Sequence, residues 1–325
     1  MTSVPVSVSA SASASATKTT QNVFDVGKYE TVLRTVETGT ESNLPIPPPQ
    51  QLLIAMPSEA GEFPLLVFVH GYLLSNSFYS QLIQHIASHG FIVIAPKLYT
   101  VAGPSATVDI DSTVATTNWL LEGLHYLLPP QVQPNMKKLG LAGHSRGGKA
   151  AFALVLEKAA TSLKFSALIG IDPVDGLGKG CQTPPPVLTY VPHSFDLDMP
   201  AMVIGTELGE IGNTLLFCVT LPAPAPKGVN HEDFFNECRK PACHFFVKDY
   251  GHCDMLDDDI GLLAGIAINI MCKSGKSREP MRRFVGGIVV AFMKAYLLDD
   301  NSDLMAIRDG QETAPVELKT IEFLE

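Results

Sequence analysis

Short, uniformly apolar runs recur along the chain and predict β-strands that are buried on both faces. Val32–Val36 alternates between apolar and polar positions and predicts a first strand, and Gln51–Pro57 predicts the second. The later apolar runs are Leu65–His70, Phe91–Pro96, Lys138–Ala142, Phe165–Ile171, Ala201–Gly205 and His244–Val247, of which the last is expected to be the final strand.

Helical patterns separate these strands. One runs through Ile83 and Ala87 and stops at Gly90, and another covers residues 114–127 before Pro129 ends it. Strands that alternate with helices form a parallel sheet, so the pattern predicts an α/β fold with a mostly parallel central sheet flanked by helices. Two later apolar segments are shorter than the ~20 residues of a membrane span and are predicted to be buried helices, Ile260–Cys272 and Phe284–Leu298.

The first 22 residues differ in composition from the rest. They are rich in Ser, Ala, Thr and Val, contain no acidic residue, and have Lys18 as their one basic residue. This composition predicts either a disordered low-complexity tail or a weak plastid transit peptide, and not a secretory signal. Residues 23–325 are predicted to form a single catalytic domain, because the chain of 325 residues suits one large domain.

The net charge and the mean hydropathy indicate which kinds of molecule the protein can bind. A net charge of −10 and a basic stretch no longer than Arg282-Arg283 argue against binding to nucleic acid. The mean hydropathy of +0.18 predicts a large core, an apolar cleft or peripheral membrane contact. The six cysteines lack the spacing of a zinc site and are expected to be free thiols, with a local disulfide between Cys238 and Cys243 as the alternative.

The segment around Ser145 has the pattern of a nucleophile elbow. An apolar strand leads into Gly143-His144-Ser145-Arg146-Gly147, and an Ala-rich helical segment follows from Lys149. Glycines at 143 and 147 are needed because a serine held in a strained turn brings the strand and the helix too close for a Cβ. We therefore predict that Ser145 is a nucleophile at the edge of an α/β-hydrolase fold.

A serine nucleophile needs a histidine as base and a carboxylic acid that orients the histidine. In α/β-hydrolases the acid comes after the serine in the chain, and the histidine comes after the acid. His252 comes directly after the last predicted strand and is predicted to be the base. Asp172 ends the strand after the elbow and is the preferred acid, with Asp175, Glu207 and Glu210 as alternatives. All these positions follow strands, and ligands bind outside the carboxyl ends of parallel strands.

Two backbone N–H groups are predicted to form the oxyanion hole, those of Tyr72 and Arg146. Gly71 allows the sharp turn that aims the first of them at the reacting carbonyl. The side chain of Arg146 either holds a substrate carbonyl or carboxylate, or pairs with a local acid and fixes the elbow. No metal or cofactor is expected: the acidic run Asp254–Asp259 lacks the spacing of a calcium loop and is predicted to cap the helix from Ile260.

Several blocks of the sequence closely resemble the plant chlorophyllase family, from about Val23 onward. These blocks are Gly143–Lys149, Ser166–Val174, Gly228–Glu232, Asp249–Asp259, Ser88–Pro96 and Met281–Phe292. The resemblance implies a serine esterase that hydrolyses the phytyl ester of chlorophyll to chlorophyllide and phytol through an acyl-enzyme. It implies the triad Ser145, Asp172 and His252 in this sequence.

The chain departs from the family pattern at two places near the expected cleft rim. Residues 215–222 are rearranged, and Glu207 stands where a glycine is common. Both departures bear on the fit of the substrate and not on the triad. The family's location varies between plastid and other compartments, so a chloroplast location is expected here, with the cytosol or an endomembrane-associated compartment as the alternative.

Two other functions share these features. A general carboxylesterase or lipase would use the same triad on other hydrophobic esters. A non-catalytic receptor with a hydrolase fold would be expected to lack a triad residue, and all three are present here.

Overall fold

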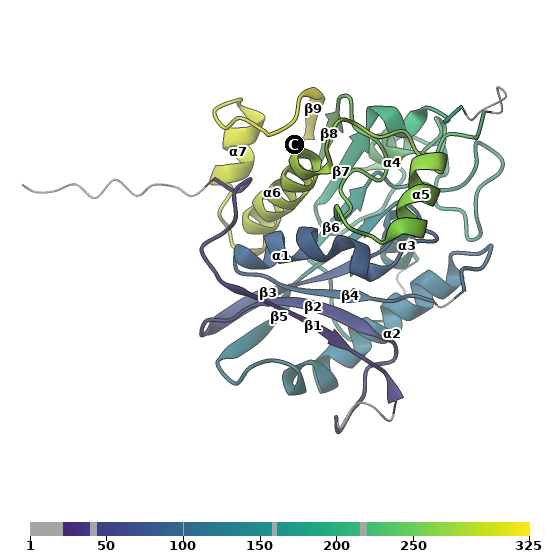
Figure 1. Ribbon diagram of the computed structural model, residues 1–325. Coiled ribbons are helices and arrows are strands. Elements are labelled where there is room, and N and C mark those ends of the chain that lie inside the picture. Colours follow the sequence, from purple (N-terminus) through teal and green to yellow (C-terminus); the bar gives the residue numbers. More distant parts are fainter. Residues whose placement is uncertain (1–21, 40–43, 100, 158–160, 215–219) are drawn as a thin grey trace, which may run out of the picture.

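The structure is a computed structural model that describes residues 22–39, 44–99, 101–157, 161–214 and 220–325. The segment predicted to be a tail or transit peptide, residues 1–22, lies outside the described part except for its last residue. The chain folds around one nine-stranded sheet with the order β1-β2-β4-β3-β5-β6-β7-β8-β9 (Figure 1). The strands are β1 Thr31–Val36, β2 Leu52–Pro57, β3 Gly61–Val69, β4 Ile92–Pro96, β5 Val132–His144, β6 Ala167–Ile171, β7 Ala201–Thr206, β8 Ala242–Val247 and β9 Leu318–Leu324.

The middle of the sheet is parallel and its two edges are antiparallel. Neighbouring strands from β4 to β8 run parallel, whereas β1 and β2 at one edge and β9 at the other pair antiparallel with their neighbours. The prediction of an α/β fold with a mostly parallel sheet is therefore confirmed. Because β5, β6 and β8 point the same way, the residues that follow them meet at one edge of the sheet.

Helices cover both faces of the sheet. The helices are α1 Ser80–Ser88, α2 Thr107–Gly123, α3 Arg146–Leu156, α4 His231–Glu237, α5 Leu262–Met271, α6 Arg278–Leu297 and α7 Ser302–Arg308, with short 3-10 helices η2 Asn76–Tyr79, η3 Leu124–Tyr126 and η4 Glu207–Glu210. One core packs α1, α6 and α7 on one face, and a second core packs α2, α3 and α4 on the other. Successive residues of a strand enter opposite cores, as Phe68 and Val69 do, which explains why the central strands are apolar throughout.

Several predictions of the secondary structure were wrong. Strand β5 begins at Val132, ahead of the expected start at Lys138. Strand β3 begins at Gly61 and includes Pro64, which was expected to precede the strand. Helix α2 begins at Thr107, ahead of the expected range 114–127, because polar positions in its first turns obscure the pattern. The strand at 242–247 is not the last one, since β9 pairs with it and closes the sheet edge.

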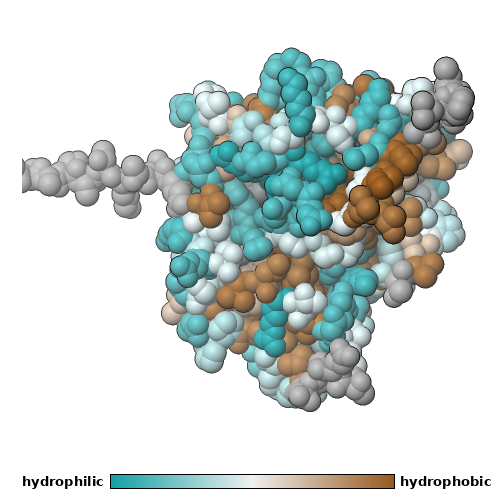
Figure 2. Space-filling model, in the orientation of Figure 1, coloured by the Kyte–Doolittle hydropathy of each residue, from teal (hydrophilic) through white to brown (hydrophobic). Residues whose placement is uncertain are grey.

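The prediction that Ile260–Cys272 is a buried helix was also wrong. A helix forms there as α5, but its outward side chains face solvent: Leu262 is 78% exposed and Leu263 is 82% exposed. Figure 2 shows an apolar patch at the position of α5. Among the helices that the structure describes, none combines the length and the apolarity that crossing a membrane requires.

Candidate active site

Ser145 lies at a sharp turn between β5 and α3. Its φ of 57° and ψ of −125° place a non-glycine residue in a strained conformation. The turn tolerates no side chain at its two glycines: a Cβ on Gly143 would lie 2.2 Å from the Gly147 carbonyl oxygen, and one on Gly147 would lie 2.4 Å from the His70 carbonyl oxygen. The Gly-x-Ser-x-Gly pattern is thus a steric requirement of this strand–turn–helix unit.

The structure brings the three predicted triad residues into one hydrogen-bonded chain. His252 Nε2 lies 2.8 Å from Ser145 Oγ, and His252 Nδ1 lies 2.7 Å from Asp172 Oδ2. In the tautomer that suits both partners, Nδ1–H donates to the carboxylate and Nε2 accepts from the serine hydroxyl. Ser145 follows β5, Asp172 follows β6 and His252 follows β8, so the parallel strand order produces the juxtaposition.

Asp172 is held rigidly as an anion. The side-chain hydroxyl of Thr206 donates to Oδ2 at 2.6 Å, and its backbone N–H donates to Oδ1 at 3.2 Å. Burial alone would raise the pKa of Asp172, but the hydrogen bond and charge of His252 outweigh that effect and lower the pKa below its usual value. Thr206 has no signal in the sequence, because its role depends on the pairing of β6 with β7.

The imidazole rings of His252 and His144 lie side by side, and their pKa values are shifted in opposite directions. Burial disfavours a charge on His252, but the hydrogen bond to Asp172 outweighs it and raises the pKa of the imidazole. Burial lowers the pKa of His144 to about 3, so this imidazole stays neutral. Its Nε2 lies 2.8 Å from the His252 carbonyl oxygen and its Nδ1 lies 2.7 Å from the Tyr79 hydroxyl. His144 therefore anchors the loop of His252 and has no contact that suits a base for Ser145.

The alternative acids all have other partners. Asp175 pairs with the buried Lys149 at 2.7 Å, and Glu207 pairs with Lys319 at 2.8 Å. Glu210 lies 3.3 Å from Lys227 Nζ. The carboxylate that contacts His252 is that of Asp172.

Ser145 and His252 line an apolar cavity of about 530 Å³. This volume is within the usual range of ligand pockets. The inner side of α5 forms one wall through Ala264, Ala267 and Ile268. The remaining lining residues are Tyr72, Leu73, Leu74, Phe78, Leu177, Leu221, Pro222, Ala223, Pro224, Cys253, Met271 and Cys272. Part of the rearranged segment 215–222 thus reaches the cavity, while residues 215–219 lie outside the described chain.

The loop after β3 packs directly against the elbow. A Cβ on Gly71 would lie 3.2 Å from Ser145 Cβ, so little space separates the two segments. The guanidinium of Arg146 lies over the ring of Tyr72, 4.1 Å from its centre, and pairs with the buried Asp109 at 3.1 Å. Of the two roles considered for Arg146, the structure displays the pairing with an acid. Burial raises the pKa of Asp109 to about 6 against the opposing effect of Arg146.

The acidic run after His252 reaches the start of α5 through Asp259, whose carboxylate accepts a hydrogen bond from the backbone N–H of Gly261 at 3.0 Å, so the predicted cap is present at this residue. Gly261 itself occupies the N-cap position of α5 and has no side chain to add a further cap. Asp257 accepts hydrogen bonds from the backbone N–H groups of Ser80 and Gln81, both at 2.9 Å, at the start of α1. Asp254 accepts from Gly251 and Gly275, and Asp258 pairs with Arg282.

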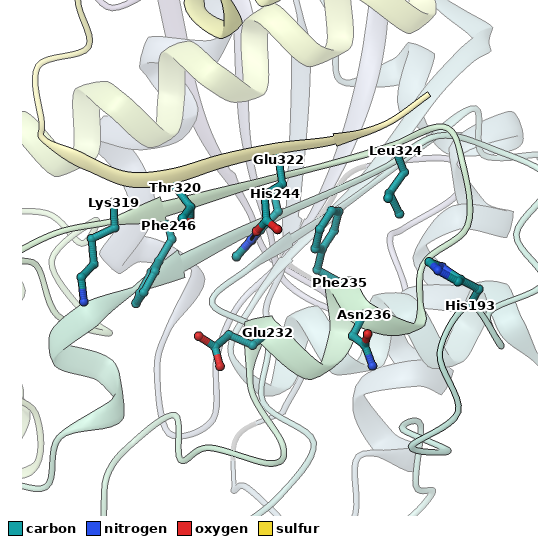
Figure 3. Close-up of a pocket in the computed structure, with 10 residues that line it drawn as sticks. All are labelled: His193, Glu232, Phe235, Asn236, His244, Phe246, Lys319, Thr320, Glu322 and Leu324. Atoms are coloured by element: carbon teal, nitrogen blue, oxygen red, sulfur yellow. Dashed lines mark hydrogen bonds and ion pairs between the residues drawn. The ribbon is translucent and has the colours of Figure 1, made fainter.

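Another cavity lies between α4 and the β8–β9 edge (Figure 3). His244 and Glu322 point toward one another there at 2.8 Å, and the buried His231 lies 2.9 Å from the other side of His244. Burial lowers the pKa of His231 to about 4. No serine or cysteine lines this cavity, so it lacks the nucleophile that accompanies the histidine at Ser145. In the described part of the chain, no group of three or more His, Cys, Asp or Glu side chains could hold a metal ion.

The predicted alternative of a disulfide between Cys238 and Cys243 is not present, because both are free and buried. Cys181, Cys253 and Cys272 are also free, and Cys218 lies outside the described residues. The Sγ atoms of Cys253 and Cys272 lie 3.7 Å apart.

Comparison with known proteins gives one consistent result. A sequence profile of the family described as Chlorophyllase matches residues 19–325. Chlorophyllase-2 of Arabidopsis thaliana is 53% identical over 315 residues, which cover 94% of this chain and 98% of the relative. Chlorophyllase-1 of the same plant is 43% identical over 303 residues, covering 92% and 91%. A protein of Citrus unshiu named Chlorophyllase-1, chloroplastic, is 42% identical over 307 residues, covering 93% and 89%.

Proposed function

This chain belongs to the chlorophyllase family, and on that basis we propose that it is a serine esterase that hydrolyses the phytyl ester of chlorophyll to chlorophyllide and phytol. The observation that carries the proposal is the hydrogen-bonded chain from Ser145 through His252 to Asp172 at the floor of an apolar cavity. Membership of the family supports chlorophyll as the substrate, and the geometry of the three side chains supports ester hydrolysis as the reaction.

The proposed reaction proceeds through an acyl-enzyme. Ser145 Oγ attacks the ester carbonyl while His252 Nε2 takes its proton, and Asp172 stabilises the imidazolium that forms. His252 then gives the proton to the departing alcohol, phytol. Water, activated by the same imidazole, attacks the acyl-enzyme and releases chlorophyllide and free Ser145.

The oxyanion of this reaction is proposed to bind the backbone N–H groups of Tyr72 and Arg146. Arg146 is the first residue of α3, where the helix dipole adds positive potential. Tyr72 follows Gly71, whose Cα lies close enough to the elbow that an added Cβ would be 3.2 Å from Ser145 Cβ. Removing one such donor costs hydrolases on the order of 3 kcal/mol of transition-state stabilisation.

The cavity suits an ester with a long hydrocarbon alcohol. Its walls are mainly apolar side chains, which come from α5, from the loop after β3 and from the segment 221–224. Burying apolar surface of the alcohol there is favourable by about 25 cal/mol per Å². The catalytic unit is proposed to be a single domain of residues 23–325, because strands from β1 to β9 form one sheet beneath the site.

Peripheral contact with a membrane is part of the proposal. The outer side of α5 presents exposed Leu262, Leu263 and Ile266, while its inner side lines the cavity. A lipid-soluble ester could therefore pass from a membrane to Ser145 along an apolar path. A chloroplast location is proposed from the relatives that are named chloroplastic.

Comparison of two substrates tests the function. Purified protein is incubated with chlorophyll or with a short-chain nitrophenyl ester, and chlorophyllide is measured by chromatography. We expect chlorophyllide from the wild type and none from Ser145→Ala. A rate confined to the nitrophenyl ester would identify a general carboxylesterase, and no turnover of either ester would favour a non-catalytic receptor.

A further inference from the structure

We propose that Tyr99 is a positioning residue for the oxyanion hole, because its hydroxyl holds the two peptide groups on either side of Tyr72. The Tyr99 hydroxyl donates to the Gly71 carbonyl oxygen at 3.1 Å and accepts from the Leu73 backbone N–H at 3.1 Å. Tyr99 is not one of the described residues that line the active-site cavity, so it acts through the backbone and not on the substrate. The role rests on the proposed function, in which the Tyr72 N–H binds the oxyanion.

The other N–H groups of the loop after β3 already have partners within the protein. The Gly71 N–H donates to the Tyr79 hydroxyl at 3.2 Å, and the Leu74 N–H donates to the Gly71 carbonyl oxygen at 3.2 Å. The Leu73 N–H is taken up by Tyr99. Among the residues that the structure describes, none accepts a hydrogen bond from the Tyr72 N–H. This N–H is therefore the donor of the loop that remains for an oxyanion.

The Gly71 carbonyl oxygen also accepts a hydrogen bond from the side chain of His70. The Leu98 backbone N–H donates to His70 Nε2 at 3.1 Å, so this nitrogen carries no proton. Burial lowers the pKa of His70 to about 4, so the imidazole is neutral and its one proton is on Nδ1. Nδ1–H then donates to the Gly71 carbonyl oxygen at 2.9 Å. Two side chains, His70 and Tyr99, thus hold the same carbonyl group.

Holding this carbonyl group sets the direction of the oxyanion donor. The Gly71 carbonyl and the Tyr72 N–H belong to one planar trans peptide group, so they point in opposite directions and turn together. Hydrogen bonds to the carbonyl oxygen also polarise the peptide group and strengthen its N–H as a donor. Leu73, which begins the next peptide N–H, has a φ of 59°, and a non-glycine residue needs surrounding contacts to keep this conformation.

The Tyr99 side chain is suited to this role in its charge and its packing. Burial raises the pKa of its hydroxyl to about 12 against the opposing effect of Arg146, so the hydroxyl keeps the proton that it donates. The ring packs edge-on against the ring of His70, with centres 5.2 Å apart, and its centre lies 5.4 Å from the Arg146 guanidinium. Phenylalanine at this position would keep both ring contacts and lose the hydroxyl alone.

The experiment compares Tyr99→Phe with Tyr29→Phe in the full chain. Tyr29 is the matched control, because it is also a half-buried tyrosine whose ring packs edge-on, against Phe63 at 5.3 Å between centres. Removing one oxyanion donor lowers kcat about 100- to 1000-fold, so misdirecting one should lower kcat on a nitrophenyl ester less, about tenfold. We expect KM to stay within about twofold of the wild-type value, because the cavity walls are unchanged. Tyr29→Phe should keep the wild-type kcat.

An analogue of the oxyanion separates positioning from a general loss of folded protein. When an alkyl trifluoromethyl ketone binds, Ser145 Oγ bonds to its carbonyl carbon, the C=O electron pair moves to the oxygen, and the serine proton passes to His252 Nε2. The methyl ketone of the same chain length remains trigonal. In Tyr99→Phe the Ki of the fluorinated ketone should rise about tenfold, in parallel with the loss of kcat, and the Ki of the methyl ketone should change less than twofold. The ratio of the two Ki values does not depend on how much of the protein is folded.

Two results would overturn the positioning role of Tyr99. They are a wild-type kcat in Tyr99→Phe and an equal rise in the Ki of both ketones. If the wild type hydrolyses esters and Tyr99→Phe matches it, the role of Tyr99 is refuted and the esterase function stands. If the wild type hydrolyses neither chlorophyll nor the nitrophenyl ester, the proposed function is refuted and the role of Tyr99 with it.

Discussion

The guanidinium of Arg146 lies 4.1 Å from the centre of the Tyr72 ring. The two residues that are proposed to supply the oxyanion hole with backbone N–H groups are thus joined by their side chains. Arg146 is itself fixed by Asp109 at 3.1 Å and by the Gly103 carbonyl oxygen at 2.8 Å. The Tyr72 loop and the elbow are therefore positioned relative to one another by this contact.

We predict that Tyr72→Leu lowers kcat about two- to fivefold, because a cation–π contact contributes about 0.5–1 kcal/mol. Tyr72→Phe keeps the ring and should retain nearly the wild-type kcat. The measurement is kcat on a soluble ester, together with the melting temperature. Since the side chain is 43% exposed, the melting temperature should change little in either variant. Equal losses in both variants would argue against the role of the ring.

The raised pKa of His252 predicts the acid side of the pH profile. His252 accepts the serine proton only when it is neutral, so kcat/KM should fall as the pH drops through its pKa. The midpoint should lie above the usual histidine value of about 6.5.

Asp172→Asn should move this midpoint to lower pH and reduce kcat by about 10⁴-fold, because the amide neither stabilises the imidazolium nor selects the correct tautomer. Glu207→Gln is the matched control, since Glu207 pairs with Lys319 and does not contact His252. A larger loss from Glu207→Gln than from Asp172→Asn would mean that the acid has been assigned wrongly.

Because one side of α5 is apolar and exposed, we predict that the rate of hydrolysis depends on whether the substrate is in a membrane or in solution. Replacing Leu262 and Leu263 with serine should lower the rate on chlorophyll in lipid vesicles about tenfold relative to the rate on a soluble ester, because apolar surface no longer enters the membrane. Leu33→Ser is the control, because Leu33 is also an exposed leucine but lies on β1, the strand at one edge of the sheet. An unchanged ratio in the α5 variant would contradict membrane contact at this helix.

Asp257 predicts an effect on stability that is separate from catalysis. Its carboxylate accepts the Ser80 and Gln81 N–H groups at the start of α1, so Asp257→Ala should lower the free energy of unfolding by about 1 kcal/mol. Denaturant unfolding measures this change. Asp259→Ala removes the single hydrogen bond from the Gly261 N–H at an exposed residue, so it should lower the free energy of unfolding by at most about 0.5 kcal/mol. The reverse order would mean that the acidic run stabilises α5 more than it stabilises α1.

The sequence was informative where local pattern and strand order decide the outcome. Ser145, Asp172 and His252 each follow an apolar run, and a parallel sheet brings such positions to one edge. The fold class and the family resemblance were confirmed, and the roles of these side chains stay predictions.

The errors have a common physical cause. The apolar composition of α5 does not reveal that a cavity lies on one side and solvent on the other. Strand β9 has no buried residue and therefore lacks the apolar pattern of the central strands, so it was not recognised. The partners Asp109 for Arg146 and Thr206 for Asp172 are distant in the sequence and have no local signal.

Labelling by a fluorophosphonate, with chlorophyllide production followed in the same samples, tests the central claim most directly. The account predicts one label per chain, mapped by mass spectrometry to Ser145, and a loss of chlorophyllide production in proportion to the fraction labelled. Ser145→Ala should take no label at that peptide and make no chlorophyllide. Continued chlorophyllide production by the fully labelled protein, or by Ser145→Ala, would contradict the claim that Ser145 is the nucleophile.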